Sequence, residues 1–149
     1  MKKILLIVML VFLVACSSGS DKESSVSLNA NYRDDLIASG LFASDANFLD
    51  EPTLESLKIK VEDFEFVDIY TANSADDASL FIVALAKDDK LADCKGQIAY
   101  YLENRLSAYK DYNPEAAEMI DNALEADFDN YIIRVISSDN ELAKSLIIK

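Results

Sequence analysis

Two neighbouring segments of this 149-residue chain restrict the fold more than any other feature. From Phe64 to Tyr70, the residues Phe64, Phe66, Asp68 and Tyr70 alternate with Glu65, Val67 and Ile69, and this period of two with many strand-forming residues is typical of a β-strand. Residues 79–86 form an almost unbroken apolar run, which predicts a strand that is covered on both faces. The polar connection over residues 72–78 has the length of a hairpin loop. We therefore expect two neighbouring antiparallel strands.

The clearest helical pattern lies in residues 91–109, where apolar residues recur at spacings of three and four. Gly96 within it costs up to about 1 kcal/mol relative to Ala, so we expect this helix to approach the sheet closely there. Asn113 as a cap and Pro114 in the first turn predict a second helix. Its core-facing residues are expected to be Ala116, Ala117, Met119 and Ile120.

The last third of the chain predicts two more strands and a helix. Residues 123–128 and 131–137 read as strands joined at Asp129-Asn130, although a helix is the alternative for the first of them. Ser138 and Glu141 have the spacing of a capping box, which predicts a final helix. The residues expected to face inward from that helix are Leu142, Ala143, Leu146 and Ile147.

These elements, in the order ββ-α-α-ββ-α, predict an α+β fold in which helices pack on a small antiparallel sheet. Residues 32–43 have mixed helical spacing, and Gly40 is placed to end a short helix there. Pro52 then interrupts the chain before a short helical turn or loop. The apolar content of 51% is enough for one modest core in this single domain.

The amino terminus has the features of a lipoprotein signal peptide. Two lysines precede a short apolar core, and Leu-Val-Ala stands directly before Cys16 as a lipobox. The apolar stretch is about half of the roughly 20 residues that a membrane span requires. We therefore expect a signal peptide over residues 1–15, a diacylglycerol on the Cys16 sulfur, a flexible linker over residues 16–30 and a domain over residues 31–149. Two or three acyl chains such as palmitate would anchor the protein to the extracytoplasmic face of the cell membrane.

Charge and cysteine content exclude several classes of function. Cleavage after residue 15 removes only Lys2 and Lys3, so the net charge changes from −13 to −15. Such an acidic protein repels the backbone of nucleic acids, which we exclude as partners. Cys94 is then the only thiol that is not acylated, and without any His nearby it is expected to be a small buried apolar residue. We expect no cofactor.

The strings Tyr112 to Glu115 (Tyr-Asn-Pro-Glu) and Asn130 to Ile133 (Asn-Tyr-Ile-Ile), together with the element order and the leader, resemble a family of small Gram-positive lipoproteins. The resemblance covers about Leu41 to Ile148. It implies an α+β domain of unknown function with an antiparallel sheet. It implies no functional residue beyond the lipidated Cys16.

Two short motifs invite comparison with penicillin-recognising enzymes. Residues 107–110 read Ser-Ala-Tyr-Lys, and residues 138–140 read Ser-Asp-Asn. The Lys-Thr-Gly element of those enzymes is absent, and Ser107 falls near the end of its predicted helix. A solvated helix end and a helix cap account for both motifs, so we expect no catalytic residues.

Carboxylates are the remaining candidates for chemistry, because the chain has no His. The sets considered for Ca²⁺ are Asp127 with Asp129 and Asn130, and Asp76 with Asp77. Neither has the glycine and the distal glutamate of a Ca²⁺ loop, so turn residues are the preferred interpretation and no metal is expected. Those considered for a glycosidase pair are Glu62, Asp63, Glu65 and Asp68.

The leading hypothesis is therefore a non-enzymatic binding or docking module of the cell envelope. It would bind an envelope protein through an apolar face, to which Tyr100 could contribute if it rather than Tyr101 is exposed. The alternatives are a protein that binds a small ligand or a divalent cation, and an envelope hydrolase that uses carboxylates or Ser107. A concave site with converging polar groups would favour the alternatives, whereas a flat apolar patch would favour docking.

Overall fold

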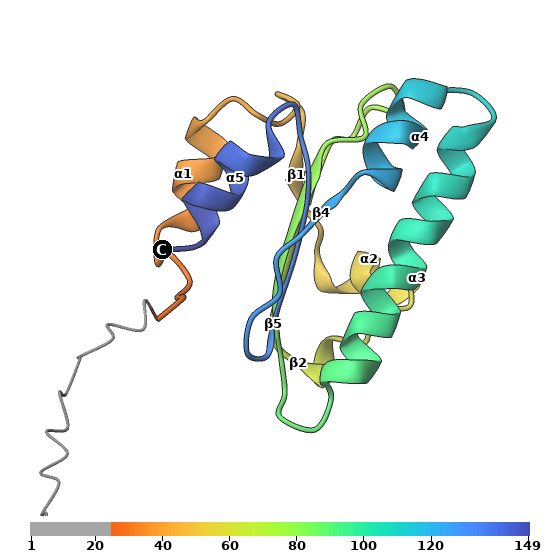
Figure 1. Ribbon diagram of the computed structural model, residues 1–149. Coiled ribbons are helices and arrows are strands. Elements are labelled where there is room, and N and C mark those ends of the chain that lie inside the picture. Colours follow the sequence, from red (N-terminus) through yellow and green to blue (C-terminus); the bar gives the residue numbers. More distant parts are fainter. Residues whose placement is uncertain (1–24) are drawn as a thin grey trace, which may run out of the picture.

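The computed structural model describes residues 25–149, which form a five-stranded antiparallel sheet with helices on both faces (Figure 1). The strands lie in the order β1-β2-β3-β5-β4. Their bounds are β1 Asn47–Phe48, β2 Phe64–Thr71, β3 Leu80–Ala86, β4 Leu124–Glu125 and β5 Tyr131–Ile136. The predicted α+β class is confirmed.

The helices divide between the two faces of the sheet. They are α1 Tyr32–Ala38, α2 Glu51–Ser56, α3 Leu91–Lys110, α4 Pro114–Asp121 and α5 Asn140–Ile147, with a 3₁₀ turn η1 at Val61–Asp63. Figure 1 shows α1 and α5 on one side of the sheet, and α2, α3 and α4 on the other. A core of buried side chains fills each interface.

The predicted hairpin is confirmed. Strands β2 and β3 pair antiparallel along their length, and β3 also pairs with β5, which places β3 at the centre of the sheet. Side chains of β3 alternate between the two cores, so its continuous apolar sequence is explained by burial on both faces. One detail differs from strict alternation: a bulge between Phe64 and Phe66 sends these two rings to opposite faces.

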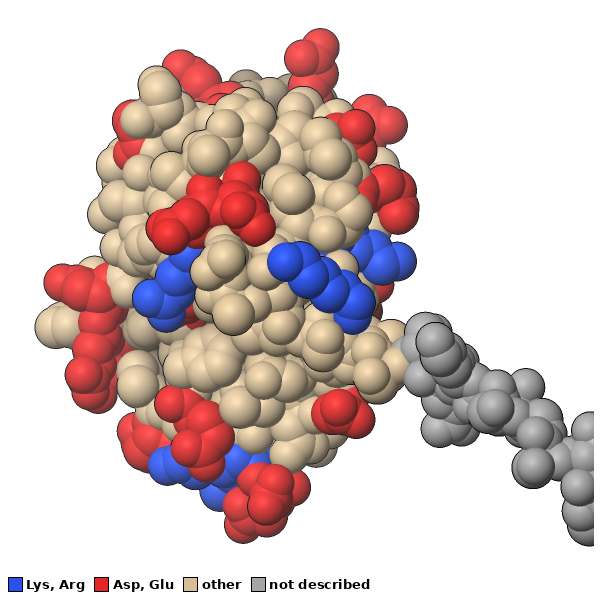
Figure 2. All heavy atoms as spheres, turned by 90° about the vertical axis from the view of Figure 1, so that its left-hand side faces the viewer, with Lys and Arg blue, Asp and Glu red and all other residues tan. Residues whose placement is uncertain are grey.

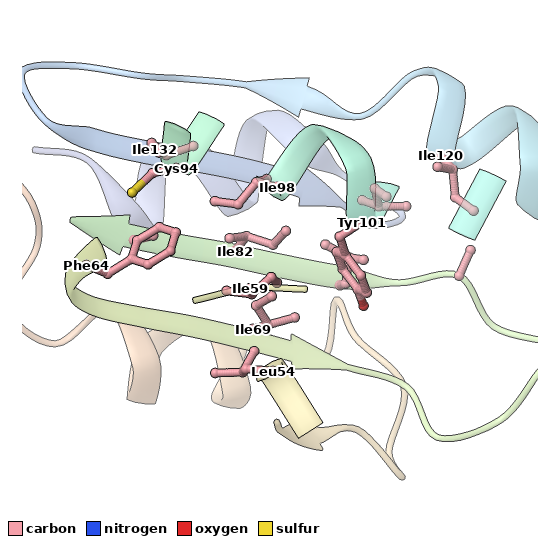
Figure 3. Close-up of a cluster of buried hydrophobic side chains, with 14 of the residues drawn as sticks. Leu54, Ile59, Phe64, Ile69, Ile82, Cys94, Ile98, Tyr101, Ile120 and Ile132 are labelled. Atoms are coloured by element: carbon pink, nitrogen blue, oxygen red, sulfur yellow. The ribbon is translucent and has the colours of Figure 1, made fainter. Parts of the chain in front are cut away.

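The core beneath α3 is drawn in Figure 3. Ile98 and Tyr101 of α3 lie over Ile82 of β3 and Ile69 of β2, and Ile120 enters from α4. Cys94 belongs to this core and is fully buried, as predicted. Asn113 caps α4 through its Oδ1 atom, which accepts a hydrogen bond from the Ala116 amide at 3.1 Å.

Four sequence expectations are wrong in detail. Gly96 does not approach the sheet, because no atom lies within 4 Å of the place where its Cβ would be. Met119 and Leu142 were expected in the core, but they are 37% and 45% exposed at the outer edges of α4 and α5. The last helix is capped by Asp139 rather than Ser138, since the Asp139 carboxylate accepts from the Leu142 amide at 2.9 Å.

The strands before α5 are confirmed, although the first is short. Strand β4 has two residues, after which Phe128 forms a single bridge with Tyr131. Asp129 between them has a φ of +46°, the left-handed conformation expected of this turn. Gly40, which follows α1, has a φ of +71° and ends that helix as predicted.

The start of the described chain lies against its end. Ser27 and Lys149 exchange two backbone hydrogen bonds of 2.9 Å, and Leu28 bridges Ile148. Asn29 is 3% exposed, and its amide donates to the Leu146 carbonyl at 2.7 Å. Residues 27–30, which were assigned to the linker, are therefore part of the domain. The signal peptide, Cys16 and the first part of the linker lie outside the described residues.

Candidate functional site

A large hollow lies beside the first half of α3. It has a volume of about 720 Å³ and is open to solvent. One wall is the segment between α2 and β2, and the other is α3. We call it the lysine hollow after three of its lining residues. Its charged and polar lining residues are Lys58, Lys60, Lys90, Glu62, Asp63, Asp93, Gln97 and Tyr100.

The lysines meet because two separate segments converge. Ile59 is fully buried between two exposed neighbours, and this arrangement leaves Lys58 and Lys60 at the surface on either side of it. Lys90 precedes α3 and comes from the far end of the β3–α3 connection. Lys58 has a φ of +68°, so the chain turns sharply where α2 ends.

Gln97 fixes the geometry of the lysine hollow. Its Oε1 atom accepts from the Lys60 backbone amide at 2.7 Å, and its Nε2 atom donates to Oδ2 of Asp63 at 2.8 Å. One side chain of α3 thus holds two points of the opposite wall, Lys60 and Asp63. The wall is further fixed by the backbone amide of Lys87, which donates to the Asp63 carbonyl at 3.1 Å.

Asp63 is a buried carboxylate whose Oδ1 atom pairs loosely with Lys90 and accepts no hydrogen bond from the described residues. The residue is 8% exposed, and Lys90 Nζ lies 3.7 Å from its Oδ1 atom, longer than a hydrogen bond. No group of residues 25–149 donates a hydrogen bond to Oδ1. This oxygen is available to a hydroxyl or amine of a ligand.

Two cations of the lysine hollow are also unused. Neither Lys58 nor Lys60 has a carboxylate within 4.0 Å on the described part of the chain. Three of the protein's 14 basic residues line this one hollow, in a chain of net charge −13. Three carboxylates, those of Glu62, Asp63 and Asp93, line it as well, so its basic and acidic groups balance. A balanced region repels an anionic ligand less than the rest of this acidic surface does.

Gly96 and Tyr100 complete the α3 wall. The two residues are four positions apart and therefore share one face of the helix, with Tyr100 50% exposed, as the sequence allowed. Gly in a helix interior costs about 0.5–1 kcal/mol relative to Ala, and no neighbouring atom requires it here. The missing side chain enlarges the lysine hollow and exposes the helix backbone to a ligand.

A second hollow of about 370 Å³ follows along the second half of α3. We call it the tyrosine hollow, lined among others by Tyr101, Tyr109, Tyr112, Arg105, Ala108 and Leu57. Two of its phenols are fixed to the β2–β3 loop: Tyr109 donates to the Asp77 carbonyl at 3.0 Å, and Tyr112 donates to the Ala75 carbonyl at 3.2 Å. The Arg105 guanidinium lies over the Tyr109 ring, 5.3 Å from its centre.

Other charged side chains form closed clusters. Arg33 donates two hydrogen bonds to the Asp68 carboxylate, at 2.5 and 2.6 Å, and Tyr32 donates a third. Burial and the Asp68 bond raise the pKa of the Tyr32 phenol well above its usual value. These groups satisfy one another and support the packing of α1 on the sheet.

Beside β4, Asp127 pairs with the buried Arg134 and with Lys95, whose Nζ lies 3.0 Å away. Burial alone would raise the pKa of Asp127, but the hydrogen bonds from Arg134 and Lys95 lower it. Since both of its oxygens accept from basic side chains, this carboxylate is unsuited to Ca²⁺.

The structure keeps apart the residues that the sequence suggested as catalytic motifs. Ser107 lies on α3 and Ser138 directly precedes α5, and these two helices pack on opposite faces of the sheet (Figure 1). Asp63 faces α3 while Asp68 faces α1, which separates these two of the carboxylates considered for a glycosidase pair. No group of three or more acidic or Cys side chains suited to a metal occurs within residues 25–149.

Cys94 lies directly beneath the lysine hollow. Its Sγ donates to the Asp63 carbonyl at 3.4 Å. Burial, followed by the charges of Asp63 and Asp93, raises the pKa of the thiol to about 11. Such a thiol is protonated at neutral pH and is a poor nucleophile.

Large exposed apolar side chains do not gather at one place on the described chain. They are distributed over several elements: Val26, Ile37, Tyr100, Tyr112, Met119 and Leu142. On the face formed by α1 and α5, acidic and basic groups are scattered among uncharged residues (Figure 2). Within residues 25–149, no helix combines the length and apolar character that crossing a membrane requires.

Comparison with known proteins adds no relative. No family model, curated protein or solved structure matches the chain. The resemblance to Gram-positive lipoproteins therefore stays a prediction. The lysine hollow was not predicted from the sequence. The string Lys58-Ile59-Lys60 indicates part of it, since burial of the apolar Ile59 places both neighbouring lysines at the surface.

Proposed function

We propose that this protein is a lipid-anchored binding module of the cell envelope, which holds an anionic ligand in the lysine hollow without transforming it. The observation that carries the proposal is the convergence of Lys58 and Lys60, both without a carboxylate partner on the described chain, on a hollow of about 720 Å³. Carboxylate or phosphate groups are the ligand chemistry that matches these ammonium groups.

The other groups of the hollow suit a ligand with further polar and flat parts. Oδ1 of Asp63 can accept a hydrogen bond from a hydroxyl or amine, and the Tyr100 ring offers a surface for stacking. Gln97 holds both walls in place, so the site is formed before a ligand binds. These features favour binding in a groove over docking through a flat apolar patch.

The proposed anchor leaves this site accessible. The described chain begins beside α1 and α5, whereas the lysine hollow lies along α3 on the opposite side of the sheet (Figure 1). If Cys16 carries the lipid, the hollow is thus separated from the attachment point by the thickness of the domain. A ligand in the envelope could reach it without contacting the membrane.

Amide NMR of the soluble domain tests the binding site. Citrate is the probe, because it carries three carboxylates, and sodium chloride of equal ionic strength is the reference. We expect citrate to shift the amides of Lys58, Lys60, Gly96 and Gln97. Replacing both lysines (Lys58→Gln with Lys60→Gln) should weaken citrate binding by about tenfold, since two solvent-exposed ion pairs of about 0.7 kcal/mol each sum to about 1.4 kcal/mol.

The matched control is Lys110→Gln with Lys149→Gln, which removes the same charge from exposed positions outside both hollows. It should bind citrate as the unmodified protein does. Equal weakening in the two double variants would show that citrate responds only to net charge. That result, or shifts spread over the whole surface, would refute the proposed site.

The anchor has its own test in a host that acylates lipoproteins. Cys16→Ser should abolish incorporation of labelled palmitate and leave an unprocessed precursor, because the acceptor thiol is lost. Cys94→Ser is the matched control and should still incorporate palmitate. Unchanged labelling of Cys16→Ser would contradict lipid attachment at this residue.

A further inference from the structure

The lysine hollow and the tyrosine hollow lie end to end along one flank of α3. Tyr100 lines the first and Tyr101 the second, and on the opposite wall Lys58 and Leu57 are likewise adjacent in sequence. We propose that the two hollows are subsites of one groove that binds an extended acidic peptide of a partner protein. This inference rests on the proposed function and names the ligand class of the same site.

The length of the groove fits a peptide segment. Its α3 wall runs from Asp93 to Tyr109, about 24 Å at a rise of 1.5 Å per residue. An extended peptide of about seven residues covers that distance at roughly 3.4 Å per residue. Citrate or a single phosphate would fill only part of the lysine hollow.

Charge and aromatic content differ between the two subsites. The lysine hollow presents the unpaired ammonium groups of Lys58 and Lys60, which suit Asp or Glu side chains. The tyrosine hollow presents the ring of Tyr112, which is 54% exposed, packs on the buried Tyr109 and is held in place by a hydrogen bond to the β2–β3 loop. Rigid tyrosine rings are good contacts for aromatic or aliphatic side chains, because little rotamer entropy is lost on binding.

Polar groups along the groove favour a peptide over an acyl chain. The exposed Asn104 lies between the two tyrosine pairs on α3, and its amide offers both a donor and an acceptor to a peptide backbone. Arg105 has no carboxylate within 4.0 Å in residues 25–149, and its one hydrogen bond, to the Asp77 carbonyl, is 3.5 Å long. A second acidic side chain or a backbone carbonyl of the peptide matches this guanidinium.

The experiment uses fluorescent peptides and the soluble domain. One eight-residue peptide reads Glu-Glu-Glu-Ser-Gly-Leu-Tyr-Leu, and another has the reverse order, because the direction of binding is not fixed by the groove. The acidic half and the apolar half are measured alone. We expect one full-length peptide to bind at least about tenfold tighter than either half, since linked segments occupy both subsites at once.

Two variants of α3 test the second subsite without a change of charge. Ala108→Gln places a longer side chain in the tyrosine hollow, whereas Ala99→Gln makes the same change at an exposed α3 position outside both hollows. Ala108→Gln should weaken the full peptide about tenfold and leave the acidic half unchanged. Ala99→Gln should change neither.

The outcomes separate this inference from the proposed function. In one outcome the Lys58 and Lys60 double variant loses citrate binding, but the full-length peptide binds no tighter than its halves. This outcome would refute the peptide groove and retain the lysine site. The peptide groove would also be refuted if the peptides bind weakly while vesicles with anionic lipids or a sulfated polysaccharide bind tightly, and Ala108→Gln reduces that tight binding. If neither citrate nor any peptide depends on the lysines, both proposals are wrong.

Discussion

Two carboxylates near the start of β2 have the same exposure and opposite surroundings. Asp63 and Asp68 are both 8% exposed and lie five residues apart. Asp68 faces α1 and accepts three hydrogen bonds, from Tyr32 and from two nitrogens of Arg33. Asp63 faces α3 and accepts a hydrogen bond from Gln97 alone among the described side chains.

This contrast distinguishes a structural carboxylate from one that can bind a ligand. Burial of a charge is costly unless hydrogen bonds and an opposite charge compensate it. Around Asp68 the compensation is complete and comes from the protein. Around Asp63 it is partial, and the nearest ammonium, that of Lys90, is 3.7 Å away. Removal of each carboxylate should therefore have different consequences.

The largest predicted effect is the destabilisation caused by Asp68→Asn. Asn would place an amide nitrogen, which cannot accept a hydrogen bond, opposite the donors of Arg33 or Tyr32. At least one of the three hydrogen bonds to this position would be lost. We expect the free energy of unfolding to fall by about 2–3 kcal/mol, less than the roughly 3–5 kcal/mol of a fully buried pair, since the Arg33 side chain is 54% exposed. Urea denaturation measures this change.

Asp63→Asn is the comparison variant. Its amide oxygen can still accept from Gln97, and the interaction with the half-exposed Lys90 is weak, so the loss should be about 0.5–1 kcal/mol. Equal losses in the two variants would contradict the distinction between a closed and an open carboxylate.

The next effect concerns the other closed cluster, at Asp127. Its pKa is lowered in the folded state by Arg134 and Lys95, against the opposing effect of burial. The resulting stability is present above the unfolded pKa of about 3.9 and is lost as the pH falls through the lower folded pKa. Asp127→Asn should cost about 1–2 kcal/mol at pH 7. The difference from the unmodified protein should shrink below about pH 4, which denaturant titrations across pH can establish.

A smaller effect should appear in alkali at Tyr32. Burial raises the pKa of this phenol in the folded state above the ordinary value of 10.0, so the unfolded chain loses the proton first. The stability from this phenol is therefore complete below about pH 10 and declines as the pH rises toward the folded pKa. Tyr32→Phe should cost about 1 kcal/mol at pH 7 through the lost bond to Asp68.

Above pH 10 the unmodified protein should lose stability faster than Tyr32→Phe. The raised pKa values of Tyr101 and Tyr109 contribute equally in both proteins and therefore cancel in the comparison. Parallel stability curves for the two proteins between pH 9 and 11 would show that Tyr32 ionises normally.

The sequence predicts the buried core and its strands better than it predicts the solvent-open lysine hollow. The apolar run of residues 80–85 identifies the central strand because burial on both faces leaves no polar position. The lysine hollow has no comparable pattern, since Lys58 and Lys90 are brought together only by the packing of α3. The bulge at Phe64 and Phe66 was also missed, because a two-residue alternation contains no sign of an inserted residue.

The smallest predicted effect is a gain in stability at the open site. Gly96 lies in the interior of α3, and a Cβ there would meet no atom within 4 Å. Gly96→Ala should therefore raise the free energy of unfolding by about 0.5–1 kcal/mol through helix propensity and reduced freedom of the unfolded chain. The same methyl group would extend into the lysine hollow and should weaken citrate and peptide binding.

Gly40→Ala is the matched control, since its Cβ also meets no atom within 4 Å but its φ is +71°. Ala is strained in that conformation, so this variant should lose about 1 kcal/mol of stability and leave ligand binding unchanged. Thermal unfolding and citrate titration of both variants provide the test. If Gly96→Ala stabilises the domain and binds citrate as tightly as before, Gly96 serves neither packing nor binding, and the lysine hollow loses one of its supporting observations.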